Sequence, residues 1–119
     1  MNQQIPLTAP EATTNSVVLI LCTVPNRSVA EKIALHLVER RLAACVNIIP
    51  GVASIFRWKN RIEESEELLL MIKSSMGRLA EISEYIRSSH PYELPEVLAI
   101  PTSGGGMEYL NWIIQETKN

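Results

Sequence analysis

The residues best suited to chemistry lie in the segment SSHPYELPEV, residues 88–97. His90 stands between the end of a helical pattern and Pro91, and Glu93 and Glu96 follow it closely. An imidazole and a carboxylate are common metal ligands, and a cysteine thiolate would add the softer donor that copper and zinc accept. The plainer alternative is that His90 satisfies the last carbonyls of the preceding helix and that the segment only turns the chain.

The two cysteines, Cys22 and Cys45, are too few for a disulfide framework and are expected to be reduced thiols of a cytoplasmic protein. Cys22 ends the aliphatic run VVLILC, where a cysteine commonly serves as a small buried hydrophobe, and Cys45 within LAACVNI is expected in the core. A cysteine beside a histidine could also act as nucleophile and base. The sequence contains no phosphate-binding glycine loop, no CxxC pair and no paired catalytic carboxylates, so we predict that this protein is not an enzyme.

The composition is that of one soluble globular domain. The chain has 119 residues, of which 46% are hydrophobic and 20% are charged, and its formal net charge is −2. It lacks the basic face that nucleic-acid binding requires and the run of about 20 apolar residues that a membrane helix requires. Residues 1–15 are polar, lack the apolar core of a secretory signal, and are expected to form a flexible tail before a single domain at residues 16–119.

Hydrophobic periodicity divides the domain into strands and helices. Ser28 and Glu31 have the spacing of a capping box, Pro50-Gly51 predicts a bulge, and Lys59-Asn60 predicts a two-residue hairpin turn. The expected strands cover residues 17–22, 42–58, 61–75 and 94–103, and the expected helices cover residues 28–40, 76–90 and 107–118, with three glycines at 104–106. The first helix is expected to bury a face made of Ala30, Ile33, Ala34, Leu37 and Val38.

This element order, β-α-β-β-α-β followed by a C-terminal helix, predicts an α+β fold of the ferredoxin-like type. The helices should lie on one face of the sheet, with the first and third strands at its centre. A strand of roughly 16 residues at about 3.3 Å per residue spans roughly 50 Å, more than a compact domain of this size accommodates. We therefore expect the hairpin of the second and third strands to project and to pair with another copy of the chain. A hairpin curled over its own core is the alternative. The EESEE run, residues 63–67, is expected to be a solvated face of this hairpin.

LAACVNIIPG, the tryptophan-led hairpin around Trp58 and HPYELPE together resemble the CutA divalent-cation tolerance family, from about Val17 to Ile114. The resemblance implies a ferredoxin-like homotrimer, related in architecture to the PII signalling proteins, and an association with tolerance of copper and other divalent cations. The copper ligands suggested for this family are a cysteine that ends the first strand and two successive histidines before the proline of HPYE. Those positions hold Cys22, Ser89 and His90 in this chain, and a serine hydroxyl is a poor copper ligand.

The expected topology brings the candidate ligands together. Because the first strand runs antiparallel to the fourth, its end adjoins the corner after His90. Cys22 and His90 should therefore lie close to each other, and Glu93 or Glu96 could add a carboxylate. Since only the thiol and the imidazole are strong donors, the sequence favours weak or intersubunit binding of copper or another divalent cation.

The remaining aromatic residues bear on assembly and ligand binding. We expect Trp58 to anchor the trimer contact, and Tyr92 and Trp112 either to line a cleft between subunits or to pack beside it. His36 is expected on the flank of the first helix or exposed. The sequence thus predicts a small trimeric metal-binding or metal-responsive protein for tolerance of copper and other divalent cations. One alternative is a PII-like trimeric sensor whose clefts bind a small ligand and whose metal phenotype is indirect, and another is a purely structural trimer.

Overall fold

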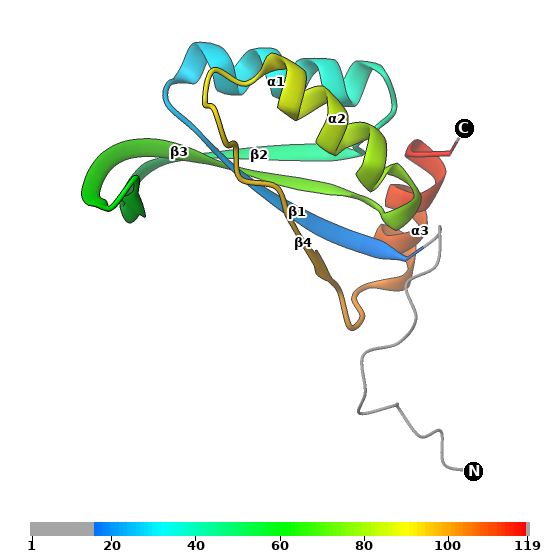
Figure 1. Cartoon of the computed structure of the whole chain (residues 1–119). Coiled ribbons are helices and arrows are strands. Elements are labelled where there is room, and N and C mark those ends of the chain that lie inside the picture. Colours follow the sequence, from blue (N-terminus) through cyan, green and yellow to red (C-terminus); the bar gives the residue numbers. More distant parts are fainter. Residues whose placement is uncertain (1–15, 119) are drawn as a thin grey trace.

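The computed structural model describes residues 16–118, and the flexible tail expected at residues 1–15 lies outside the described residues. The elements are β1 (Val17–Val24), α1 (Arg27–Glu39), β2 (Cys45–Trp58), β3 (Arg61–Ser75), a 3-10 turn (Met76–Arg78), α2 (Leu79–Ser89), β4 (Leu98–Pro101) and α3 (Met107–Glu116). The sheet is antiparallel with the strand order β2-β3-β1-β4, and α1 and α2 lie on one side of it (Figure 1). The predicted ferredoxin-like α+β fold and its central strands are confirmed.

The core lies between the sheet and the two helices α1 and α2. Alternate residues of β1 point into it, and Val18, Ile20, Cys22 and Val24 are all 0% exposed. They meet Ala30, Ile33 and Leu37 of α1 and Ile82 and Ile86 of α2. The predicted buried face of α1 is thus largely confirmed, but Val38 is 41% exposed because it lies at the edge of the stripe.

The first helix begins earlier than its capping-box spacing predicted. Asn26 is the N-cap, and its side-chain Oδ1 accepts a hydrogen bond of 2.9 Å from the N–H of Val29. The expectation of a cap at Ser28 was therefore wrong. Asparagine and serine are comparable N-caps, and the extended backbone at Asn26 decides between them.

The β2–β3 hairpin projects from the body, as predicted, and gives the chain principal extents of 54 × 32 × 23 Å (Figure 1). The register shifts between Ile49 and Val52, so the predicted bulge at Pro50-Gly51 is confirmed. Lys59 and Asn60 have φ angles of 50° and 66°, the left-handed pair that a type I′ turn requires. β4 is shorter than predicted, because the chain from Leu94 to Val97 turns a corner before pairing begins.

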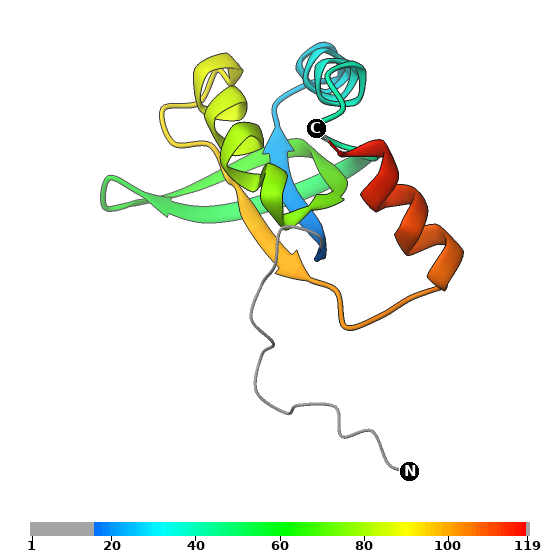
Figure 2. The same ribbon diagram turned by 90° about the vertical axis from the view of Figure 1, so that its right-hand side faces the viewer.

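The second face of the sheet is also apolar and is largely uncovered. Strand partners share a face, and Leu21 is paired with both Met71 and Leu98. We call this surface the open face; it is made of Leu19, Leu21, Leu69, Met71, Leu98 and Ile100. Leu98 and Ile100 are 58% and 45% exposed. Figure 2 shows α3 apart from the α1–α2 layer, near the end of the sheet where β1 begins.

A candidate ligand cleft beside the corner after the second helix

His90 joins the end of α2 to the end of β1. It is the C-cap of α2, its backbone N–H donates to the Ile86 carbonyl, and the residue is 7% exposed. Ring Nε2 lies 2.7 Å from the Thr23 carbonyl oxygen, and Nδ1 accepts a 3.1 Å bond from the N–H of Tyr92. These partners define a neutral ring with its proton on Nε2. As predicted, the corner lies against the end of β1, next to Cys22.

Cys22 is a buried thiol at this point of the fold. The residue is 0% exposed and faces the core. Burial, followed by the charges of Glu96 and Glu67, raises the pKa of the thiol to about 12. Cys22 is therefore protonated at neutral pH, whereas a metal ligand must be a thiolate.

The Cys22–His90 pair does not fit a copper ion in this arrangement. Both ring nitrogens of His90 already have hydrogen-bond partners, and the thiol carries its proton. Ser89 is half-buried, and the Glu93 carboxylate lies 3.7 Å from the Lys59 ammonium at the hairpin turn. Over residues 16–118, no group of three or more His, Cys, Asp or Glu side chains is arranged to hold a metal ion.

The structure brings three other side chains together beside this corner. Glu67 is 7% exposed, and its Oε2 accepts a 2.7 Å hydrogen bond from the Tyr92 hydroxyl. Burial, and then the charge of Glu67, raises the pKa of Glu96. Burial, and then the hydrogen bond to Glu67, raises the pKa of Tyr92 to about 12. The expectation that the whole 63–67 run is solvated was therefore wrong for Glu67.

Two adjoining cavities surround Tyr92 and share Phe56 and Leu94. The first, which we call the acidic cleft, has a volume of about 410 Å³, and Thr23, Glu67 and Glu96 contribute to its walls. The second, which we call the aromatic cleft, has a volume of about 600 Å³ and is lined in part by Phe56, Trp58 and Tyr92. Volumes of this size suit small ligands. Trp58 and Tyr92 thus line a cleft within the single chain. The trimer contact expected at Trp58 and the cleft between subunits expected at Tyr92 stay predictions.

Trp112 and Cys45 lie outside both clefts. Trp112 is on α3, 40% exposed, with its ring 5.5 Å from that of Tyr109, and it lines neither cleft. Cys45 is half-buried at the start of β2, so the expectation of a core position was wrong. β2 is an edge strand, and an edge strand has a neighbour on one side only.

The two thiols should differ sharply in reactivity. In the native chain at pH 8, we expect iodoacetamide to modify Cys45 and to leave Cys22 unmodified, because Cys22 is fully buried and its pKa is raised to about 12. Peptide mass spectrometry after timed labelling measures this, and labelling in denaturant should modify both. Equal native rates would contradict the burial of Cys22.

The geometry is that of a ferredoxin-like α+β protein with a cleft beneath an extended hairpin, and known proteins share it. The CutA1 divalent ion tolerance protein family matches residues 18–116. Protein CutA of Mus musculus is 47% identical over 104 residues, which span 87% of this chain and 59% of the mouse protein. The divalent-cation tolerance protein CutA of Thermus thermophilus is 46% identical over 99 residues, which span 83% of this chain and 96% of that protein.

A solved structure agrees with these relatives. The divalent cation tolerance protein (Cut A1) from Thermus thermophilus has a TM-score of 0.84 and 44% identity, and the match covers 86% of this chain and 99% of that chain. The chain described here belongs to the CutA1 divalent ion tolerance family.

Proposed function

We propose that this chain is a divalent-cation tolerance protein that binds copper or another divalent cation directly, without catalysis, as a cytoplasmic homotrimer. Membership of the family supports cation tolerance, which is the name that the Thermus thermophilus relative carries. Direct binding rests on one observation, the acidic cleft, in which burial and then the charge of the buried Glu67 raise the pKa of Glu96.

Electrostatics favours a cation in this cleft. The carboxylates of Glu67 and Glu96 repel each other in a partly desolvated space, and both charges also act on the Cys22 thiol. A divalent cation would relieve this repulsion, and carboxylate oxygens are ligands for most divalent cations. Because the pKa of Glu96 is raised, protons compete with the cation, and binding should weaken as the pH falls.

The open face supports assembly into a homotrimer. A strand that is apolar on both sides is typical of a sheet that is covered on both faces, yet in the single chain α1 and α2 cover only one. The hairpin adds exposed apolar side chains, since Ile55 and Ile62 are 71% and 60% exposed. Further copies of the chain would bury these surfaces together. The two unpaired cysteines suit the reducing cytoplasm.

The aromatic cleft favours a second candidate function, that of a PII-like sensor of a small molecule. Its walls combine three aromatic residues with charged ones, namely Phe56, Trp58, Tyr92, Arg57, Glu63 and Glu93. Apolar walls with a few charged groups are typical of small-molecule sites. In this alternative the cation effect on cells would be indirect.

A calorimetric titration of the reduced full chain with zinc and with copper(II) tests the proposed function. We expect saturable binding by the wild type that weakens about tenfold or more, about 1.4 kcal/mol, in Glu67→Gln and in Glu96→Gln. Glutamine keeps an acceptor for the Tyr92 hydroxyl, so Glu67→Gln removes charge while retaining that hydrogen bond.

Glu66→Gln is the matched control, because Glu66 precedes Glu67 on β3 but is exposed. Cys22→Ser separates the two candidate metal sites. If Cys22→Ser abolishes binding while Glu67→Gln does not, the site is the Cys22–His90 pair and not the acidic cleft. If the wild type binds neither metal, direct binding of copper and zinc is excluded and the sensor function becomes the better supported of the two.

A further inference from the structure

Helix α1 ends in a backbone conformation that normally belongs to glycine. The N–H of Arg41 donates to the Val38 carbonyl at 3.1 Å and the N–H of Leu42 donates to the Leu37 carbonyl at 2.9 Å, which together form a Schellman motif. Arg41 occupies its left-handed position with φ of 58°. A side chain is unfavourable there and glycine is preferred. Arg41 therefore carries a backbone cost that a favourable contact of its side chain would offset.

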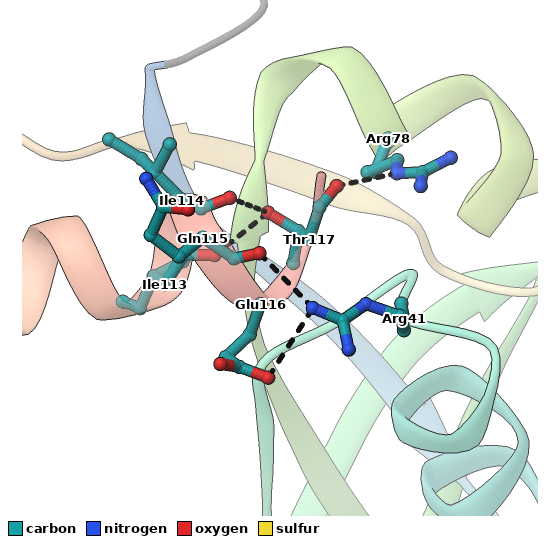
Figure 3. Close-up of polar contacts among 7 residues, drawn as sticks. All are labelled: Arg41, Arg78, Ile113, Ile114, Gln115, Glu116 and Thr117. Carbon is teal, nitrogen blue, oxygen red and sulfur yellow. Dashed lines mark hydrogen bonds and ion pairs between the residues drawn. The ribbon is translucent and has the colours of Figure 1, made fainter. Parts of the chain in front are cut away.

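The guanidinium of Arg41 reaches the C-terminal end of α3 (Figure 3). Its Nη2 donates to the Gln115 carbonyl at 3.2 Å and lies 3.6 Å from a carboxylate oxygen of Glu116. The last carbonyls of a helix have no partners within the helix and form the negative end of its dipole, so a cation at this end is stabilising.

A second guanidinium binds the same end of α3. The Nε of Arg78 donates to the Thr117 carbonyl at 2.8 Å, and Arg78 is only 8% exposed. Thr117 is itself buried, and its hydroxyl lies 2.9 Å from that of Ser75 on β3. Two arginines from different parts of the chain thus converge on the last residues of one helix.

The other end of α3 is held weakly. Its N-cap is Gly106, which offers no side-chain cap, and it follows the exposed glycines Gly104 and Gly105. Of the α3 residues only Ile113 is buried, whereas Met107 is 76% exposed. Leu110 and Ile114 are half-buried, so the polar contacts at the C-terminal end add to a small apolar contact.

We propose that Arg41 and Arg78 form a guanidinium clamp that docks α3 across one end of the open face, and that Arg41 keeps its left-handed backbone for this contact. α3 is then a strap with a glycine hinge at one end and the clamp at the other. The strap meets the sheet through the 3.3 Å contact between the Lys73 ammonium and the Tyr109 hydroxyl. If α3 detached from the sheet, the uncovered part of the open face would become longer. The clamp is independent of cation binding.

Hydrogen exchange measured by mass spectrometry on the full chain tests the clamp. Arg41→Ala removes the guanidinium and keeps an unfavourable left-handed residue, whereas Arg41→Gly removes the guanidinium and relieves the backbone. Arg40→Ala is the control, since it removes the neighbouring charge and Arg40 makes no polar side-chain contact with α3 among residues 16–118.

We expect α3 amides to exchange about tenfold faster in both Arg41 variants, as befits loss of a charge-assisted hydrogen bond, and to be unchanged in Arg40→Ala. The β1 and β3 amides should stay protected in all three variants. Unchanged α3 exchange in Arg41→Ala would overturn the proposal. A second result would also overturn it, namely faster α3 exchange in Arg41→Ala together with wild-type exchange in Arg41→Gly. Backbone strain, and not loss of the guanidinium, would then be the cause. Since the Arg41 side chain is 57% exposed, these variants should fold.

Discussion

If the open face is the interface of the proposed homotrimer, a chain with Leu98→Glu should sediment as a monomer at concentrations at which the wild-type chain sediments as a trimer. Leu98 is paired with Leu21 on the open face and is 58% exposed in the single chain. A glutamate at such an exposed position should change the stability of one chain by only about 0.5 kcal/mol. In a trimer that covers the open face, each carboxylate would instead be buried without a partner, at a cost of several kcal/mol per subunit. Sedimentation equilibrium over a range of concentrations measures the change.

The matched control for this experiment is Leu35→Glu. Leu35 is 60% exposed on α1, so the two substitutions are alike in chemistry and in exposure. We expect Leu35→Glu to leave the assembly intact and both variants to keep the circular dichroism of the folded chain. A trimeric Leu98→Glu chain would show that the open face is not the interface.

Replacing His90 by alanine should lower the free energy of unfolding by about 2–4 kcal/mol. The buried ring links the Thr23 carbonyl to the N–H of Tyr92, and alanine would leave both groups without these bonds. It would also loosen the corner that places Tyr92 against Glu67. Urea unfolding measured at fixed chain concentration gives the difference, because the stability of an assembled protein depends on concentration.

His36→Ala provides the comparison, since His36 and His90 are the only histidines of the chain. The His36 ring is half-buried and stacks on Tyr85 with the ring centroids 3.7 Å apart. Loss of this stacking should cost about 0.5–1.5 kcal/mol. If the two variants lose equal stability, the two hydrogen bonds of His90 do not brace the corner.

Features of the fold that depend on local chemistry were predictable from the sequence. The turn at Lys59-Asn60 needs two left-handed residues, and asparagine tolerates that conformation. The bulge at Pro50-Gly51 accommodates proline, which has no N–H. Both features could therefore be predicted from the residue types. Strand order followed from element order in the same way. The start of α1 was not predictable to the residue, because Asn26 and Ser28 are both good N-caps and only the surrounding backbone selects one.

The candidate site was harder to predict, because it is formed by contacts between distant parts of the chain. The approach of His90 to the end of β1 followed from the topology, but the partners of its two nitrogens did not. Glu67 looked like one of several solvated acids, although it lies in phase with the apolar Leu69 and Met71 on β3. That phase places Glu67 on the side of β3 that α1 and α2 leave uncovered, so the alternation did not predict its burial beside Tyr92. Its hydrogen bond to Tyr92 spans 25 positions of sequence and could not be inferred from either residue alone.

Proline lies on both outer strands of this sheet. β2 and β4 are its edges, and Pro50 interrupts the first at its bulge while Pro101 ends the second. A proline offers no N–H to an incoming strand, so each edge has a position at which an added strand would lack a ladder hydrogen bond. A chain with a projecting hairpin and an apolar second sheet face would otherwise be at risk of growing into fibres. The two prolines therefore disfavour open-ended growth through the sheet edges and leave the apolar second face available for the closed assembly proposed above.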